Sequence, residues 1–306
     1  MIRASAPGRA GIIGNPSDIY GGTVVSVAVP LRATCTLQPS DEWSLPDDLR
    51  LWRAATARYP LDRPYRVVWD TQIPVSRGIS GSTALLAATL LCVLAARDET
   101  PELDTVQKRT AFAELVRDIE RNEADVVCGY QDAQMIVHGG LQAMDFRGKH
   151  PVEPGPPPTV IALHDDLPFL VVSTDVERLS GSVHGPMAQR WVAGEEAVVE
   201  GIARISELGR LGLAALESRD WMTLGALMQE NQRVTASLGG SGEPIDRLVD
   251  ACLRHGAFGA KLAGAGLGGT VIALTLDPDH LESELRAEGY TLFTRPDGGP
   301  GVRLEP

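Results

Sequence analysis

Short runs of apolar and β-branched residues, separated by glycine-rich segments, set the pattern of the first half of the chain. These runs predict strands at Ile2–Ala6, Val24–Val29, Ala33–Leu37 and Tyr65–Trp69. Two longer segments carry apolar residues at helical spacing and predict helices at Ser82–Arg97 and Thr105–Glu123. The first half is therefore expected to form a mixed sheet with helices packed on it.

A proline-rich connector follows at Pro151–Pro158. Proline removes an amide donor and fixes φ, so this stretch cannot lie inside a helix or strand. Beyond it the pattern predicts strands at Thr159–Leu163, Phe169–Ser173, Thr270–Leu276 and Tyr290–Thr294. Between them it predicts helices at Pro186–Glu217, Asp220–Ser237 and Pro244–His255. This order indicates an α+β second half, and we place the domain boundary so that residues 1–160 and 161–306 form two domains.

The size and charge of the chain narrow the classes of function. A length of 306 residues with 43% hydrophobic residues suits two globular domains with a cleft between them. The formal charge of −12 argues against nucleic acid and against anionic membranes, because both need a basic surface. Lysine occurs only at positions 108, 149 and 261, so arginine, backbone amides and a bound cation must supply the positive potential around an anionic ligand.

The cysteines and the chain start bear on location. The 4 cysteines are dispersed, with no pair at C-x-x-C spacing, which is typical of free thiols in a cytoplasmic protein. The N-terminus lacks the pattern of a signal peptide, and the apolar stretch near Leu85–Ala96 is too short to cross a bilayer. We therefore expect a cytoplasmic protein without a membrane anchor.

Small residues crowd the segment directly before the first predicted helix. They are Gly78, Ser80, Gly81, Ser82 and Thr83. Such residues leave the first amides of the helix open toward an anion, and the helix dipole adds a favourable field. Ser82 taken alone is explained as a helix cap. The excess of glycine and serine beyond what one cap requires favours a phosphate site.

A second glycine-rich segment lies between Lys261 and Leu274. Its Gly264, Gly266 and Gly269 satisfy the pattern G-x-G-x-x-G, which needs a strand before it and a helix after it in a dinucleotide-binding fold. Here a helical pattern precedes and a β-branched strand follows, so that fold is excluded. The sequence also contains no G-x-x-x-x-G-K-[ST] motif, which excludes a P-loop.

A third segment, Ala6–Gly22, places Arg9 and Asp18 among glycines that allow close approach of a ligand. Taken alone, it is more typical of two tight hairpin turns. All three segments together, in their order along the chain, resemble the GHMP kinase superfamily of galactokinases, homoserine kinases, mevalonate kinases and phosphomevalonate kinases. The resemblance spans nearly the whole chain.

Within that superfamily the sequence is most similar to glucuronokinases. The similar stretches are Ile13–Asp18, Asp70–Pro74, Gly78–Ser82, Gln131–Asp132, Gly139–Leu141, Met144–Phe146, Ser180–His184 and Gln189–Trp191. Most superfamily members carry Glu where this chain has Asn15, and the glucuronokinase group shares the Asn.

The resemblance implies a fold and an activity. The fold is α+β with two domains, an N-terminal one like ribosomal protein S5 domain 2 and a C-terminal ferredoxin-like α/β sandwich. The activity is ATP- and Mg²⁺-dependent phosphorylation of the anomeric hydroxyl of a sugar or uronic acid, with glucuronate to glucuronate 1-phosphate as the best single choice. The partner is thus a small molecule in carbohydrate metabolism, and a homodimer is left open.

The resemblance also assigns roles to single residues. Asp132 matches the catalytic base, and a carboxylate beside an arginine stays ionised at neutral pH; without its flanks it is better explained as a helix N-cap. Arg9 matches the basic residue that activates the acceptor hydroxyl and stabilises charge on the phosphoryl oxygens. Gly264, Ala265, Gly266 and Gly268 match the floor beneath the reacting groups.

Metal and acceptor sites follow in the same way. Mg²⁺ needs few protein oxygens, and Ser82 and Glu120 match them, with Glu123 and Asp125 close enough to leave the register open. A solvated carboxylate on a charged helix is the alternative for Glu120. The residues that match acceptor contacts are Asn15, Asp18, Tyr20 and Arg190, together with Arg178 and His184 for a uronate carboxylate.

Two other classes of function remain open. Diphosphomevalonate decarboxylases share the fold and the glycine-rich segments, and a non-catalytic ligand-binding paralogue would share the fold alone. The sugar-kinase-like flanks of Asp18 and Asp132 argue against the decarboxylase. Retention of Asp132, Ser82 and Arg9 argues against the non-catalytic paralogue.

Overall fold

The computed structural model of the 306-residue chain describes residues 1–74, 77–126, 128–164, 167–174, 176, 184–264 and 269–306. Its strands are β1 (Ile2–Ile13), β2 (Thr23–Pro39), β3 (Tyr65–Thr71), β4 (Leu141–Asp145), β5 (Thr159–Leu163), β6 (Phe169–Ser173), β7 (Gly259–Leu262), β8 (Thr270–Leu274), β9 (Leu292–Thr294) and β10 (Arg303–Leu304). Its helices are η1 (Ser17–Tyr20), α1 (Arg50–Arg58), α2 (Gly81–Ala96), α3 (Val106–Asn122), α4 (Gln131–His138), α5 (His184–Val192), α6 (Glu196–Glu217), α7 (Trp221–Ser237), α8 (Glu243–Arg254) and α9 (Pro278–Ala287).

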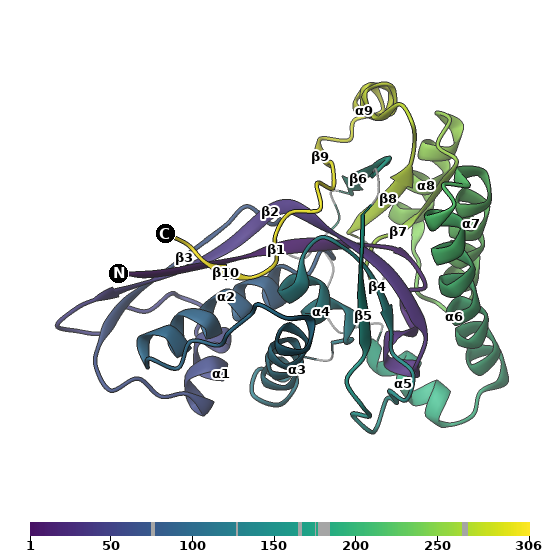
Figure 1. Ribbon diagram of the computed structural model, residues 1–306. Coiled ribbons are helices and arrows are strands. Elements are labelled where there is room, and N and C mark those ends of the chain that lie inside the picture. The colour runs from purple at the N-terminus through teal and green to yellow at the C-terminus, as the bar shows by residue number, and fades with distance from the viewer. Residues whose placement is uncertain (75–76, 127, 165–166, 175, 177–183, 265–268) are drawn as a thin grey trace.

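The strands form two sheets, which confirms the α+β fold class. One sheet has the order β10-β1-β2-β4-β5 with β3 also paired to β2, and the other has the order β7-β8-β6-β9. Helices α1 to α4 lie on one side of the first sheet, and α6, α7 and α8 stand beside the second (Figure 1). The chain ends beside its beginning, because β10 pairs with β1.

The first sheet reaches further along the chain than the sequence predicted. The division at residue 160 falls inside β5, and the sheets themselves divide between β5 and β6. The predicted helix Pro186–Glu217 is two helices, α5 and α6, which meet near Gly194, where φ is +74°. Helices α1, α4 and α9 and strands β4 and β7 were not predicted, because each is short and is fixed by its neighbours rather than by its own pattern.

The interpretation of Ala6–Gly22 as tight hairpin turns is wrong for its first half. Strand β1 continues to Ile13, and Gly8 and Ala10 pair with Val29 and Val27 of β2. Glycine and alanine have weak strand preference, so only the antiparallel partner explains the strand. The two strands predicted at 24–29 and 33–37 are likewise parts of the single strand β2.

The helical pattern predicted directly before Gly264 is also wrong, because strand β7 lies between α8 and the glycines. Strand β8 then returns antiparallel to β7, with Leu262 opposite Val271. A dinucleotide-binding unit needs a helix at that point. The dinucleotide-binding fold is therefore excluded by the strand that follows the glycines.

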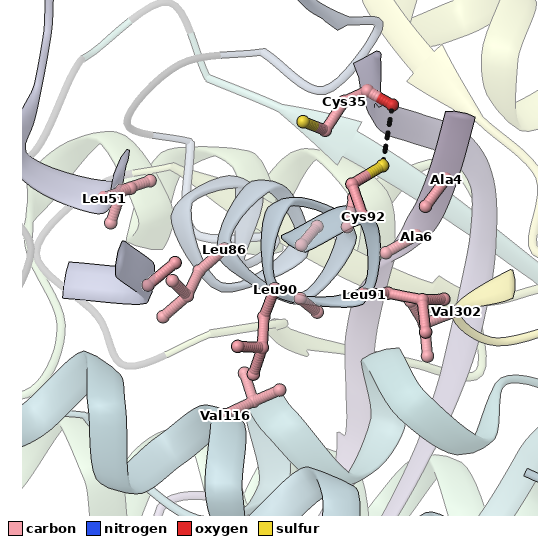
Figure 2. Packing of buried hydrophobic residues seen from close by; sticks show 14 of the residues in the cluster. Ala4, Ala6, Cys35, Leu51, Leu86, Leu90, Leu91, Cys92, Val116 and Val302 are labelled. Atoms are coloured by element: carbon pink, nitrogen blue, oxygen red, sulfur yellow. Dashed lines mark hydrogen bonds between the residues drawn. The ribbon is translucent and has the colours of Figure 1, made fainter. Parts of the chain in front are cut away.

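Helix α2 is the centre of the first core. It is apolar on all sides and buried nearly throughout, as expected for a helix enclosed by other elements. Figure 2 shows Leu90 directed toward Val116 of α3, and Leu91 toward Val302 near the chain end. On the sheet side, the Cys92 thiol lies 3.3 Å from the carbonyl oxygen of Cys35.

A second core joins the two sheets. It combines Ala10, Ile12 and Ile13 of β1 with residues of β6 and β8 and with the inner faces of α6 and α7. The two ends of β1 therefore lie in different cores, since Ala4 and Ala6 belong to the first. Arg9 lies on β1 where these cores meet. Within the described part of the chain, no helix has the length and apolar character needed to span a membrane.

We expect Leu90→Ala to lower the free energy of unfolding by about 2–5 kcal/mol, because it leaves a cavity in a closely packed core. Urea unfolding followed by circular dichroism measures the change. Met222→Ala on α7 is the control, since this side chain is 70% exposed and its loss should cost less than about 0.5 kcal/mol. Equal losses in both variants would contradict the assignment of α2 to the core.

Candidate active site

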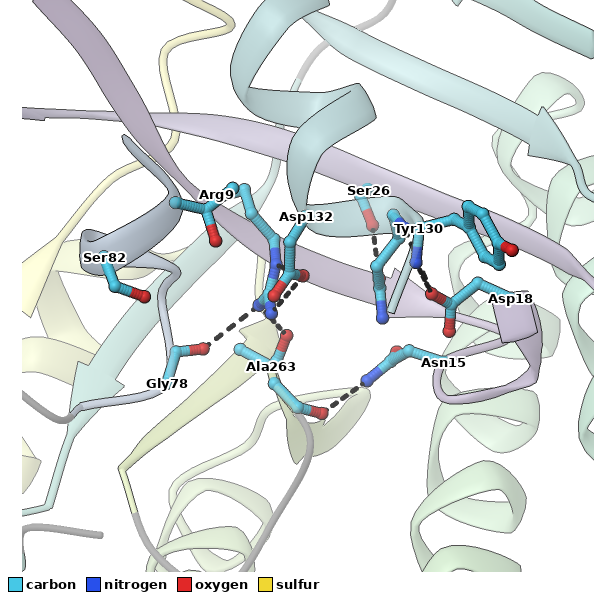
Figure 3. Close-up of polar contacts among 12 residues, drawn as sticks. Arg9, Asn15, Asp18, Ser26, Gly78, Ser82, Tyr130, Asp132 and Ala263 are labelled. Carbon is cyan, nitrogen blue, oxygen red and sulfur yellow. Dashed lines mark hydrogen bonds and ion pairs between the residues drawn. The ribbon is translucent and has the colours of Figure 1, made fainter. Parts of the chain in front are cut away.

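The Arg9 guanidinium links three segments that are far apart in the sequence (Figure 3). Its Nε and Nη2 atoms each lie 2.7 Å from Asp132 Oδ1. Its Nη1 donates to the carbonyl oxygens of Gly78 at 3.1 Å and Ala263 at 2.7 Å. The Arg9 residue is only 2% exposed. Arg9 lies in one glycine-rich segment. Its buried guanidinium thus binds a carboxylate and a carbonyl oxygen from each of the other two glycine-rich segments.

Asp132 lies in the first turn of α4, but it is not the helix cap. That position is Tyr130, which makes no side-chain cap bond. Asp18 supplies the cap from η1: its Oδ2 accepts from the amides of Tyr130 at 2.6 Å and Gln131 at 3.0 Å. The N-cap interpretation of Asp132 is therefore wrong, and its 17% exposed carboxylate lies against Arg9.

The start of α2 has the form of an anion site. The first helical bond runs from the Ala84 amide to the Ser80 carbonyl, and no side chain caps the turn. The amides of residues 81–83 therefore precede the helical ladder and lie at the positive end of the helix dipole. Ser80 has a left-handed φ of +63°, and its buried hydroxyl has no hydrogen-bond partner among the described residues. The capping interpretation of Ser82 is wrong.

Ser82 and Thr83 instead turn to Glu120 on α3. Ser82 Oγ donates to Glu120 Oε1 at 3.1 Å, and Thr83 Oγ1 lies 2.9 and 2.8 Å from the two carboxylate oxygens. Glu120 is 1% exposed, so the interpretation as a solvated carboxylate is also wrong. Glu123, directly after the end of the same helix, pairs with Arg58. Of the two glutamates, Glu120 is the one beside Ser82.

Burial raises the pKa of Glu120 to about 7, and the nearby charge of Asp132 adds to the rise, while the Thr83 and Ser82 hydroxyls oppose it. A carboxylate and a hydroxyl side by side are oxygen donors of the kind that Mg²⁺ takes. A divalent cation would also offset the cost of the buried negative charge. The donor set thus fits the predicted metal pair.

The backbone of the glycine-rich segment before α2 contacts the backbone of the glycine-rich segment after β7. A Cβ on Gly264 would lie 2.4 Å from the Gly78 carbonyl oxygen, so only glycine fits there. Thr270 Oγ1 donates to the carbonyl oxygen of Arg77 at 2.7 Å. Because Arg77 directly precedes Gly78, this bond stabilises the contact between the two segments. Ala265, Gly266 and Gly268, predicted as part of the floor, lie outside the described residues, as does Arg178.

The predicted acceptor residues group around η1. Asp18 is fully buried, and its Oδ1 has no partner among the described residues. The Tyr20 ring packs against Trp191 with centroids 5.4 Å apart, and burial followed by the charge of Asp18 raises the Tyr20 pKa above its usual value. Asn15 is buried and holds Gly264 through a bond from Nδ2 to its carbonyl oxygen at 2.9 Å.

Arg190 lies near this group, but its guanidinium binds other residues. Its guanidinium pairs with Glu195 at 2.6 Å and donates to the Leu238 carbonyl oxygen at 2.9 Å. Its neighbour Trp191 is the residue that reaches Tyr20. The structure therefore brings Asn15, Asp18 and Tyr20 together and connects Arg190 to them through Trp191.

Sequence reasoning missed the support behind α4. The ring of Tyr130 has the Arg117 guanidinium 3.6 Å and the Lys149 ammonium 4.0 Å from its centre. Lys149 also pairs with Glu114 at 2.6 Å. These residues come from α3, α4 and the segment after β4, so no spacing in the sequence connects them. The scarcity of lysine was the only signal that singled out Lys149.

Comparisons with known proteins agree with this arrangement. The family model described as GHMP kinases N terminal domain matches residues 49–140, and the model described as GHMP kinases C terminal matches residues 213–290. The chain is 29% identical to Glucuronokinase 1 of Arabidopsis thaliana over 93% of this chain and 89% of that protein. It is 27% identical to the mevalonate kinase of Aeropyrum pernix over 99% and 98%.

Among solved structures, the galactokinase of Lactococcus lactis in complex with galactose has a TM-score of 0.77 at 16% identity. The match covers 99% of this chain and 94% of that one. At this identity the likeness concerns the fold alone. It extends over both sheets and therefore over the elements that carry Arg9, Asp132 and Ser82.

We expect the stability of the metal-free protein to depend on Glu120 in a pH-specific way. Because its folded pKa is raised from 4.5 to about 7, the folded state holds a proton that the unfolded state releases between these values. Its contribution to stability therefore falls as pH rises through that window. Glu120→Gln should gain ~1–3 kcal/mol relative to the wild type between pH 5 and 8.

Thermal and urea unfolding across that pH range measure the difference. Glu123→Gln at the C-terminal cap of the same helix is the matched control, since its carboxylate is partly exposed and pairs with Arg58. A stability difference between Glu120→Gln and the wild type that stays constant from pH 5 to 8 would contradict the burial of a titrating carboxyl.

Proposed function

The chain belongs to the GHMP kinase superfamily of ATP-dependent small-molecule kinases, and we propose that its acceptor is the anomeric hydroxyl of a sugar or uronic acid. The best single choice of acceptor is glucuronate, giving glucuronate 1-phosphate. The observation that carries the proposal is the Arg9 guanidinium, which joins Asp132 to the segment that leads into α2. A base and an anion site therefore meet at one side chain.

The nucleotide site is proposed at the start of α2. Uncapped amides at residues 81–83 suit the phosphates of ATP, and the buried hydroxyl of Ser80, which has no partner among the described residues, adds a donor there. Ser82 and Glu120 would hold Mg²⁺, which supplies charge neutralisation at the phosphate oxygens when bound. Gly78 and Gly264 leave no side chain between the two glycine-rich segments.

The chemistry assigned to the chain's own residues is positioning and proton transfer. Asp132 accepts the proton of the acceptor hydroxyl as its oxygen attacks the γ-phosphorus, and the bond from that phosphorus to the β-phosphate oxygen breaks. Arg9 fixes the orientation of the Asp132 carboxylate. Its guanidinium also stabilises negative charge that moves onto the transferred group.

The acceptor class rests on the loop that contains η1. Asp18 has one carboxylate oxygen bound to α4 amides and one without a described partner, which suits a sugar hydroxyl. The relatives named for glucuronate are about as similar to this chain as the one named for mevalonate. Asn15, shared with the glucuronokinase group, favours the sugar acid.

We expect Asp132→Asn to lower kcat by ~10²–10⁴, because the amide cannot accept the hydroxyl proton, while the affinity for ATP stays within about threefold. Single-turnover kinetics and ATP titration measure the two quantities. Asp47→Asn in an exposed loop is the control and should leave both unchanged. Full turnover by Asp132→Asn would remove Asp132 from the role of base.

The acceptor is identified by ADP release from ATP and Mg²⁺ with a panel of free sugars, uronic acids and mevalonate. We expect the largest kcat/KM with glucuronate and a phosphorylated product at the anomeric carbon by ³¹P NMR. Release of inorganic phosphate and CO₂ from a diphosphorylated acid would instead indicate a decarboxylase. Absence of ADP with every acceptor would indicate a non-catalytic ligand-binding protein.

A further inference from the structure

Lys261 is a fully buried lysine at the junction between β7 and the glycine-rich segment that follows. Its ammonium nitrogen lies 2.6 Å from Asn15 Oδ1 and 2.6 Å from the Leu262 carbonyl oxygen. Both partners are neutral. A buried ammonium is costly unless it is paired with an opposite charge, so this arrangement calls for an explanation.

Two other buried cations near the site have carboxylate partners. Arg9 pairs with Asp132, and Lys149 pairs with Glu114. Within the described ranges, no acidic side chain forms an ion pair with Lys261. Burial, and after it the nearby charge of Arg9, lowers the pKa of Lys261 well below its usual value.

Asn15 connects Lys261 to the acceptor loop. Its Oδ1 accepts from Lys261 and its Nδ2 donates to the Gly264 carbonyl oxygen, so both ends of the amide are used. Its own carbonyl oxygen accepts from Asn231 of α7 at 3.1 Å. Asp18, three residues further along the loop, is directed at the start of α4 (Figure 3). A glutamate at position 15 would neutralise Lys261 and would lose the donor to Gly264.

We propose that Asn15 and Lys261 make the site selective for an acceptor that carries a carboxylate. This inference rests on the proposed function and narrows it to sugar acids. When Lys261 is protonated, its positive charge lies beside the acceptor loop without a described protein carboxylate to balance it, and a carboxylate on the acceptor favours that protonated form. In a buried setting an unbalanced charge acts over several ångströms, so the carboxylate of the acceptor supplies the balance. A neutral sugar of the same stereochemistry does not.

The test compares kcat/KM for glucuronate with glucose, and for galacturonate with galactose, in the wild type and two variants. Asn15→Glu supplies the missing counter-charge from the protein, and Lys261→Met removes the ammonium at similar volume. We expect each to lower the ratio of acid to neutral sugar by at least ~10-fold, mostly through KM for the acid, with KM for ATP changed less than about threefold.

Gln107→Glu on the exposed start of α3 is the matched control, because it adds the same negative charge on a helix beside the first sheet, whereas Lys261 lies in the second sheet (Figure 1). It should leave the ratio unchanged. An unchanged ratio in both site variants, with their thermal unfolding intact, would overturn the inference. A ratio that falls equally in Gln107→Glu would also overturn it, because the effect would then be one of net charge.

Turnover measurements on the wild type alone also test the inference, and they do not depend on whether the variants fold. Turnover of a sugar acid at least ~10-fold above its neutral counterpart supports the inference. Turnover of neutral sugars above the acids overturns it but leaves the sugar-kinase activity intact. Turnover of neither class overturns the proposed acceptor and the inference with it.

Discussion

The charge-assisted bonds of one buried arginine decide how this molecule is assembled. A guanidinium has five N–H donors, and burying it is tolerable only when acceptors surround it. Arg9 finds them in Asp132 of α4, Gly78 before α2 and Ala263 after β7. Because β1 runs through both cores, the two sheets and two helix starts are fixed around that side chain.

The starts of α2 and α4 meet at Arg9 and differ in how their first amides are capped. Helix α4 is capped by the carboxylate of Asp18, which leaves Asp132 to face Arg9. Helix α2 has no side-chain cap, so its first amides keep their affinity for an anion. Under the proposed function, the start of α4 presents the base and the start of α2 presents the phosphate site. Asp18 links the loop that contains η1 to the start of α4, which carries Asp132.

An acidic protein of net charge −12 must create positive potential locally if it is to hold several phosphates. It does so with a few buried cations whose surroundings differ. Arg9 is balanced by Asp132, Lys149 is balanced by Glu114 beside Tyr130, and Lys261 is bound only to neutral oxygens among the described residues. Glu120 is the opposite case, a buried acid whose pKa burial raises to about 7.

The sequence by itself determined the α+β class, the long helices α2 and α3, and the small-residue start of α2, because period and glycine content are local properties. Its resemblance to a known family named Arg9, Asp132, Ser82 and Glu120 together. Only the tertiary structure decided that residues 7–13 are strand, since their pairing with β2 overrides weak local preference. It also decided that Asp18 rather than Asp132 caps α4, and that Asn15 is bound to Lys261. Contacts between residues that are distant in the sequence leave no periodic trace in it, so these relations become visible only when the chain is folded.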